Sequence, residues 1–356
     1  MNALQQTKQL GQSIWLDNLS RTLIREGGLQ KLITGDGVSG VTSNPAIFFN
    51  AISKSPYYKD DVARLKAAQT PAEPLYEALV IPDIQAACDL MLPEYLGTQG
   101  RDGYVSLEVS PALAHDAAGT VAAGLRLKAA VNRKNLLIKV PATTAGLTAI
   151  EELIAQGCSV NVTLMFSLTH VDQVANAYIT GLERHARAGG NLSVVKSVGS
   201  LFLSRVDTLV DKQLEATGNK ALQGKAGVAL ARLAYAAYQK TFQSTRFDAL
   251  ANQGAMPQTM LWASTGAKNP AYSDVLYVEN LIGPDTINTV PDATLAAFRD
   301  HGKAANTLTV GAVDAQAQFD ALAMAGIDTH AVGNQLQSEG VKLFEQAFDD
   351  LLKLLE

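Results

Sequence analysis

Several motifs that would place this sequence in a function class are missing. Its two cysteines, Cys88 and Cys158, lie far apart and outside any Cys-x-x-Cys pair, which fits a reducing compartment and argues against a zinc cluster. No uncharged apolar run reaches the roughly 18 residues that a membrane span needs, and the first residues form no apolar signal core. We therefore expect a cytoplasmic protein that does not enter a membrane, with both thiols buried and unreactive.

Runs of basic residues are missing as well. The chain has 29 Lys and Arg against 34 Asp and Glu, a net charge of −5, and no cationic run long enough to follow a nucleic-acid backbone. It also lacks the phosphate loop Gly-x-x-x-x-Gly-Lys-Ser/Thr, the zinc motif His-Glu-x-x-His and the hydrolase motif Gly-x-Ser-x-Gly. We expect no nucleic-acid partner and no metal, and any phosphate group would be bound by a few local cations.

What the sequence does contain is an alternation of strands and helices. Eight short β-rich runs recur along its 356 residues, and most are separated by stretches in which apolar residues return every three or four positions. Strand followed by helix, repeated eight times, is typical of a (β/α)8 barrel, an α/β fold. The expected strands are residues 13–17, 39–43, 104–109, 135–140, 159–164, 193–198, 258–263 and 276–281.

The chain is longer than the roughly 250 residues typical of such a barrel. We expect the surplus in an N-terminal helix around 3–12, a helical insertion around 45–101 and a C-terminal helix over 335–355, whose apolar face docks on the barrel. No Ser/Gly/Pro-rich linker or repeat divides the chain. One barrel domain over residues 1–356 is therefore the main expectation, and two domains with a helical segment around 50–100 are the alternative.

One lysine lies inside a run that otherwise reads as a buried strand. Lys139 follows Leu-Leu-Ile and precedes Val, and a buried ammonium must be paired, neutral or used in chemistry. Burial disfavours the charged amine, and a neutral amine attacks carbonyls to form a Schiff base. The alternatives are a structural lysine paired with Glu108, and a different nucleophile, Lys196, which stands in the similar run Val-Val-Lys-Ser-Val.

Polar residues recur at the ends of the expected strands, where a barrel of this type builds its active site. Asp17 ends the first strand, Asn44 follows the second, the third carries Glu108, and the fifth carries Asn161 and Thr163 on one face. Each has a structural alternative, such as an N-cap for Asp17, a turn at Asn44 or strand propensity for Thr163. Their repetition at matching positions favours a shared functional pocket.

Two later loops carry candidate anion-binding groups. Arg205 closes the segment 200–205 after the sixth expected strand, and Lys268 closes the segment 264–268 after the seventh. Loops late in such a barrel are a frequent phosphate site, and cations with hydroxyls suit it. A solvated helix face for Arg205 and a capped turn for Lys268 are the structural alternatives.

Taken together, these residues resemble the transaldolase family over nearly the whole chain. The resemblance rests on Asp17 and on the segments 41–45 (Val-Thr-Ser-Asn-Pro), 106–109 (Ser-Leu-Glu-Val), 137–143 (Leu-Ile-Lys-Val-Pro-Ala-Thr), 161–167 (Asn-Val-Thr-Leu-Met-Phe-Ser) and 200–205 (Ser-Leu-Phe-Leu-Ser-Arg). The longer bacterial members are the most similar, and they are cofactor-free barrel enzymes of the pentose phosphate pathway. The resemblance also selects Lys139 over Lys196 as the Schiff-base lysine.

The resemblance implies a mechanism in which a dihydroxyacetone unit moves between sugar phosphates. Lys139 would attack C2 of a ketose phosphate, and Glu108 would shuttle protons through a water held by Thr163. Asp17 would then take the proton of the C4 hydroxyl, the C3–C4 bond would break, and an enamine would remain on Lys139. The implied donors and acceptors are sedoheptulose 7-phosphate or fructose 6-phosphate, and glyceraldehyde 3-phosphate or erythrose 4-phosphate.

The resemblance also implies the substrate-binding residues. Asn44 and Asn161 would bind the hydroxyls of the enamine, Ser200 and Arg205 would anchor the phosphate, and Phe202 would shape the pocket near the catalytic aspartate.

One position departs from the family pattern. Gly266 stands where shorter members carry a phosphate-binding arginine, so we expect Lys268, with Ser264, to replace it. Two rival functions remain open: an aldolase that uses the same lysine, and a sugar-phosphate-binding barrel in which Lys139 is merely paired with Glu108. The sequence leaves a monomer and a homodimer equally open.

Overall fold

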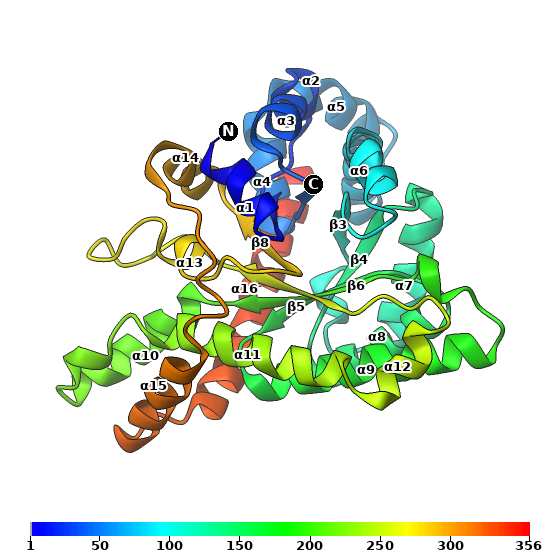
Figure 1. Ribbon diagram of the computed structural model, residues 1–356. Helices are drawn as coiled ribbons and strands as arrows, with labels where there is room; N and C mark the ends of the chain where they lie inside the picture. The colour runs from blue at the N-terminus through cyan, green and yellow to red at the C-terminus, as the bar shows by residue number, and fades with distance from the viewer. Residues whose placement is uncertain (1) are drawn as a thin grey trace.

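The eight strands of the protein form a closed parallel barrel, as the sequence predicts (Figure 1). The computed structural model describes residues 2–356, and each strand pairs with the next along the chain until β8 pairs with β1. The strands are β1 (Gln12–Leu16), β2 (Gly40–Val41), β3 (Val105–Glu108), β4 (Leu136–Pro141), β5 (Val160–Met165), β6 (Ser197–Phe202), β7 (Thr259–Ala263) and β8 (Thr286–Val290).

Of the eight predicted strands, the sixth was displaced along the sequence and the eighth was assigned to the wrong segment. The sixth strand spans Ser197–Phe202 and not 193–198, because residues 192–194 form a 3-10 turn. The eighth strand was expected at 276–281, but residues Leu276–Glu279 form the helix α13 and the strand begins at Thr286. A short apolar run does not distinguish a buried strand from a buried helix by its periodicity, and 276–281 is such a run.

Helices surround the barrel and supply the extra length. The short α1 (Ala3–Gln9) precedes the barrel, and α4 (Pro45–Lys54), α5 (Lys59–Ala67) and α6 (Ala72–Gly97) form the predicted insertion. The others are α2 (Arg21–Arg25), α3 (Gly28–Lys31), α7 (Ala117–Val131), α8 (Thr144–Ala155), α9 (Leu168–Arg187), α10 (Ser204–Ala216), α11 (Ala226–Phe242), α12 (Thr245–Ala251), α14 (Asp292–His301) and α15 (Ala312–Met324). Among residues 2–356, none of these helices combines the length and apolarity that crossing a bilayer requires.

A large aromatic side chain fills the barrel next to its shortest strand. Trp15 of β1 is fully buried, and its indole Nε1 donates a hydrogen bond to Asp102 Oδ1 at 2.8 Å. The paired residue of β2 is Gly40, where an added Cβ would lie 2.3 Å from the indole ring. A residue without a side chain is therefore required opposite Trp15, since any other would collide with it.

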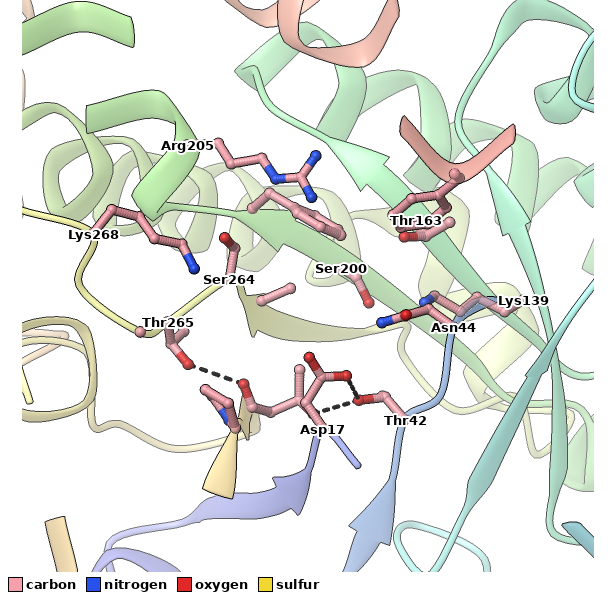
Figure 2. A pocket seen from close by; sticks show the side chains of 16 residues that line it. Asp17, Thr42, Asn44, Lys139, Thr163, Ser200, Arg205, Ser264, Thr265 and Lys268 are labelled. Atoms are coloured by element: carbon pink, nitrogen blue, oxygen red, sulfur yellow. Dashed lines mark hydrogen bonds between the residues drawn. The ribbon is translucent and has the colours of Figure 1, made fainter. Parts of the chain in front are cut away.

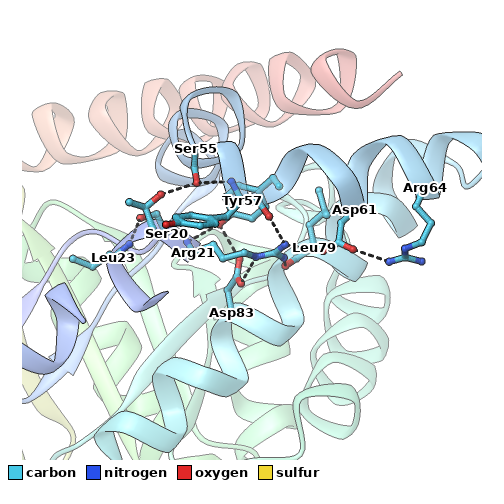
Figure 3. A network of polar contacts seen from close by, with 11 residues as sticks. Ser20, Arg21, Leu23, Ser55, Tyr57, Asp61, Arg64, Leu79 and Asp83 are labelled. Carbon is cyan, nitrogen blue, oxygen red and sulfur yellow. Dashed lines mark hydrogen bonds and ion pairs between the residues drawn. The ribbon is translucent and has the colours of Figure 1, made fainter. Parts of the chain in front are cut away.

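A buried arginine joins the helical insertion to the segment that follows β1 (Figure 3). Arg21 at the start of α2 donates to Asp83 Oδ1 at 2.9 Å, to Asp61 Oδ2 at 2.7 Å and to the carbonyl oxygen of Leu79 at 2.9 Å. Tyr58 donates to the other oxygen of Asp83 at 2.8 Å. The network satisfies an otherwise costly buried charge, and it ties α5 and α6 to the polypeptide just beyond the first strand.

The last helix, α16 (Thr329–Leu355), runs along the barrel and covers the ends of several strands (Figure 1). It begins six residues earlier than the predicted residue 335, because Asp328 caps it by accepting hydrogen bonds from the amides of His330 and Ala331. Its Gln337 donates to the carbonyl oxygens of Ala142 and Leu164, at 2.8 and 3.1 Å, just beyond β4 and within β5. The helix is thereby fixed across the carboxyl-terminal side of the barrel.

Candidate active site

A pocket of about 220 Å³ opens at the carboxyl-terminal ends of the strands (Figure 2). Such barrels place their active sites at this end. Side chains from at least six strands or the loops that follow them reach it, together with one residue of α16. The lining residues are Asp17, Thr42, Asn44, Lys139, Thr163, Ser200, Phe202, Arg205, Ala263, Ser264, Thr265, Gly266, Lys268, Thr289, Pro291 and Phe344.

The lysine amine of β4 lies between a carboxylate and the pocket. Lys139 pairs in register with Glu108 of β3, and its Nζ lies 3.2 Å from Glu108 Oε2 and donates to the carbonyl oxygen of Ser43 at 3.0 Å. Both side chains are only 6% exposed. The ion pair lacks hydrogen-bond geometry, so Glu108 Oε2 has no hydrogen-bond partner within residues 2–356. The structure therefore brings together Lys139 and Glu108, for which the sequence left a structural ion pair and a catalytic role open.

Burial dominates the electrostatics of that pair. It raises the pKa of Glu108 to about 6, even though the neighbouring Lys139 lowers it. A carboxyl group with such a pKa changes its protonation state near neutral pH, which suits a group that both takes and returns protons.

Asp17 supplies a second buried carboxyl group, directly after β1. It accepts a hydrogen bond at 2.7 Å from Thr42 Oγ1, which lies 2.6 Å from Thr289 Oγ1. Burial raises the pKa of Asp17, while the charge of Lys139 and the Thr42 hydrogen bond lower it. The expected structural alternative does not occur, because the N-cap of α2 is Ser20. The aspartate is thus free to face the pocket.

A bulge in β5 sets the position of the pocket threonine. The register with β6 shifts between Val162 and Met165, and Leu164 has a φ of 59°, which a bulky residue rarely adopts. Thr163 Oγ1 is buried and without a hydrogen-bond partner in the described part of the chain. The bulge turns this hydroxyl towards the pocket, and Gln337 of α16 holds the carbonyl of Leu164 in place.

The two predicted asparagines occupy different layers. Asn44 lines the pocket, although its Oδ1 caps α4 by accepting a hydrogen bond from the Ile47 amide at 3.0 Å. Asn161 is fully buried and does not line the pocket: its Nδ2 donates to Ser106 Oγ at 2.9 Å, and its Oδ1 accepts from Ser200 Oγ at 2.7 Å. Asn161 therefore orients Ser200, which does reach the pocket.

The predicted cations lie on the side of the pocket away from Lys139 (Figure 2). The guanidinium of Arg205 stacks over Phe202 with 5.6 Å between Cζ and the ring centre, and partial burial lowers its pKa. Lys268 is exposed, and Ser264 Oγ lies 2.8 Å from Ser204 Oγ. Two cations with hydroxyls between them form a suitable environment for an anionic group.

The other nucleophile considered, Lys196, lies outside this pocket. It precedes β6 and faces a separate cavity at the amino-terminal ends of the strands. The buried His170 accepts a hydrogen bond from the Phe166 amide at 3.1 Å, as expected of a packing residue at the start of α9. Within residues 2–356 the structure groups no three His, Cys, Asp or Glu side chains as metal ligands.

Several pocket residues were not singled out from the sequence. Thr42 donates a hydrogen bond to Asp17, and Thr289 hydrogen-bonds Thr42. Thr289 was missed because β8 was assigned to the wrong segment. The β-branched run Thr-Ile-Asn-Thr-Val at 286–290, followed by a proline, was the available signal. Phe344, whose ring centre lies 5.5 Å from Lys139 Nζ, was expected only to dock α16 on the barrel.

Fold and site together define a class: a (β/α)8 enzyme whose pocket at the carboxyl-terminal ends of the strands holds an aspartate and a buried lysine paired with a glutamate. A family model described as Transaldolase/Fructose-6-phosphate aldolase matches residues 14–355, and the chain belongs to this family.

Similar proteins from three bacteria share the name Transaldolase. The chain is 54% identical to the one from Thiobacillus denitrificans over 355 residues, 99% of each chain. It is 48% identical to the one from Neisseria gonorrhoeae over 352 residues, again 99% of each chain. For the one from Mycolicibacterium smegmatis the identity is 49% over 346 residues, 96% of this chain and 93% of that protein. The resemblance inferred from the motifs is therefore confirmed over the full length.

Proposed function

We propose that the protein is a transaldolase, a transferase that moves a dihydroxyacetone unit between sugar phosphates in the pentose phosphate pathway of the cytoplasm. Donors are sedoheptulose 7-phosphate or fructose 6-phosphate, and acceptors are glyceraldehyde 3-phosphate or erythrose 4-phosphate. The observation that supports this most strongly is the Lys139 amine 3.2 Å from Glu108, in a pocket whose far side carries Arg205 and Lys268. An amine at one end and cations at the other match a ketose with a terminal phosphate.

The first step joins the donor to Lys139. Neutral Nζ attacks the C2 carbonyl, the carbonyl oxygen leaves as water, and an imine forms. Glu108 exchanges the protons of this step through a water held by Thr163. Two observations support this role: Glu108 Oε2 lies beside the reacting amine at 3.2 Å, and Thr163 Oγ1 is buried without a hydrogen-bond partner among residues 2–356.

The second step breaks the C3–C4 bond. Asp17 takes the proton from the C4 hydroxyl, and C4 becomes the aldehyde carbon of the released aldose. The electrons of the C3–C4 bond pass into the imine, which is protonated at nitrogen, to give a neutral enamine on Lys139. Thr42 orients the carboxylate for this transfer through its 2.7 Å hydrogen bond. Asn44 binds hydroxyls of the three-carbon unit directly, and Asn161 acts on them through Ser200.

The remaining steps run in reverse with an acceptor aldose phosphate. Arg205, Ser264 and Lys268 bind its phosphate, and Phe202 supports the guanidinium while closing the pocket wall. Phe344 of α16 covers the lysine side chain during the lifetime of the enamine.

Transfer is distinguished from simple cleavage by its dependence on an acceptor. Purified protein is incubated with fructose 6-phosphate, with or without erythrose 4-phosphate, and the products are separated by chromatography. We expect sedoheptulose 7-phosphate only with the acceptor, and little free dihydroxyacetone without it. Release of dihydroxyacetone at the same rate under both conditions would instead establish the aldolase alternative, and binding without either product would establish a non-catalytic barrel.

A further inference from the structure

A second cavity opens at the amino-terminal ends of the barrel strands, opposite the active site. It has a volume of about 870 Å³ and is lined by the first residues of β1, β7 and β8 and by Lys196, which immediately precedes β6. The proposed reaction uses none of these residues. The cavity is therefore a separate space with its own buried amine.

Among residues 2–356, no carboxylate contacts this amine directly. Lys196 is 4% exposed, and its Nζ donates to Thr259 Oγ1 at 2.7 Å and to the carbonyl oxygen of Pro257 at 3.3 Å, both neutral acceptors. Burial lowers the pKa of Lys196 to about 8, although the charges of Asp102 and Asp285 oppose the shift. A substantial fraction of this amine is therefore neutral near physiological pH.

The two aspartates that act electrostatically on Lys196, Asp102 and Asp285, differ in their surroundings. Asp102 is committed, because it accepts hydrogen bonds from Ser13, Trp15 and its neighbouring amide. Asp285, by contrast, is exposed on the cavity lining.

The cavity rim also carries cations. Arg101 is exposed there and acts electrostatically on Lys196, whereas Lys8 is held by Glu94 at 2.6 Å. The exposed guanidinium of Arg101 is suited to bind a phosphate that enters the cavity.

We propose that this cavity binds small phosphorylated aldehydes and that Lys196 forms a Schiff base with them. Neutral Nζ attacks the aldehyde carbon, one amine proton moves to the former carbonyl oxygen, and a carbinolamine results. The carbinolamine oxygen then leaves as water with a second proton supplied by solvent, and the lone pair of Nζ forms the C=N bond. Arg101 pairs with the phosphate at the rim.

The expected selectivity over other lysines follows from the neutral fraction of the amine. At pH 7 an amine with a pKa near 8 is neutral in roughly one molecule in ten, and one with an ordinary pKa near 10.4 in roughly one in 2,500. The neutral fraction of Lys196 is thus about 200 times that of an ordinary lysine, and the restricted access of an aldehyde to the buried amine reduces this advantage. We therefore expect Lys196 to react at least about tenfold faster than an exposed lysine such as Lys220 or Lys353.

The test is reductive trapping on the wild-type protein, so that no variant has to fold. Protein is incubated at pH 7 with glyceraldehyde 3-phosphate or with glyceraldehyde, the imine is reduced with cyanoborohydride, and labelled lysines are quantified by peptide mass spectrometry. The map separates Lys196 from Lys139. We expect Lys196 labelling to exceed that of Lys220, to favour the phosphorylated aldehyde, and to rise with pH through about 8.

Two variants serve as controls. Lys196→Arg removes the label and keeps the positive charge. Arg101→Ala reduces labelling by the phosphorylated aldehyde several-fold more than labelling by glyceraldehyde, because Arg101 pairs with the phosphate and also lowers the pKa of Lys196. Equal labelling by both aldehydes in the wild type would overturn the phosphate assignment. Labelling of Lys196 no faster than that of Lys220 would overturn the inference while leaving the chemistry of Lys139 untouched.

Discussion

Replacing Glu108 by glutamine removes the proton shuttle and keeps the size of the side chain. The carboxyl group contacts the reacting amine at 3.2 Å and has a pKa of about 6. General acid–base groups contribute typically ~10²–10⁴-fold to rate. We expect kcat/KM of Glu108→Gln to fall by that factor, which corresponds to roughly 3–6 kcal/mol of transition-state stabilisation at ~1.4 kcal/mol per tenfold.

The pH profile gives the same carboxylate a second signature. Because burial raises the pKa of Glu108 to about 6, the catalytically competent carboxylate is lost as pH falls through that value. Wild-type kcat/KM should therefore drop about tenfold between pH 7.5 and 5 on account of this group, and the drop should be missing in Glu108→Gln.

The matched control is Glu94→Gln, which removes a glutamate that pairs with Lys8 far from the pocket. An ion pair so exposed contributes ~0–1 kcal/mol, so activity and thermal stability should hardly change. Activities are measured in a coupled assay with fructose 6-phosphate and erythrose 4-phosphate. A Glu108→Gln protein that folds and keeps activity within threefold of the wild type, with its acid limb unchanged, would refute the assignment.

Other substitutions separate the remaining roles. Asp17→Asn should lower turnover at least ~100-fold yet still give a borohydride-trapped adduct on Lys139, because only the later proton transfer is lost. Arg205→Ala should raise KM for phosphorylated sugars ~10–100-fold, because a charge-assisted hydrogen bond to the phosphate is lost. Lys268→Ala should raise KM less, because Lys268 is exposed. Steady-state kinetics with phosphorylated and unphosphorylated substrates measure both effects, and an unchanged KM for the phosphorylated sugars would contradict both predictions. Asp83→Ala should lower the unfolding free energy in urea by roughly 3–5 kcal/mol, because it leaves a buried guanidinium without its main partner; a loss below ~1 kcal/mol would contradict that reading.

Much of the site was predictable because its chemistry stands out locally. Lys139 and Glu108 are single charged residues in apolar strands, and a parallel register between neighbouring strands brings them together. Asp17 is similarly visible at a strand end. The barrel itself follows from the repeated alternation of strand and helix, because the local pattern of apolar residues indicates most of these strands and helices segment by segment.

Other features depend on contacts that local sequence does not encode. The bulge at Leu164 is held by Gln337, which lies 173 residues away. Phe344 reaches the pocket only because α16 crosses the barrel, and a helical apolar face does not reveal what it covers. The eighth strand was assigned to 276–281 because a short segment with buried apolar residues such as Tyr277 and Val278 has the same composition in a helix as in a strand.

The most direct test of the account is the intact mass and peptide map of the protein after borohydride reduction with fructose 6-phosphate. The account predicts one stable adduct on Lys139 in the wild type and none in Lys139→Met. A fully active protein without any adduct, or an adduct from this ketose found only on Lys196, would contradict it.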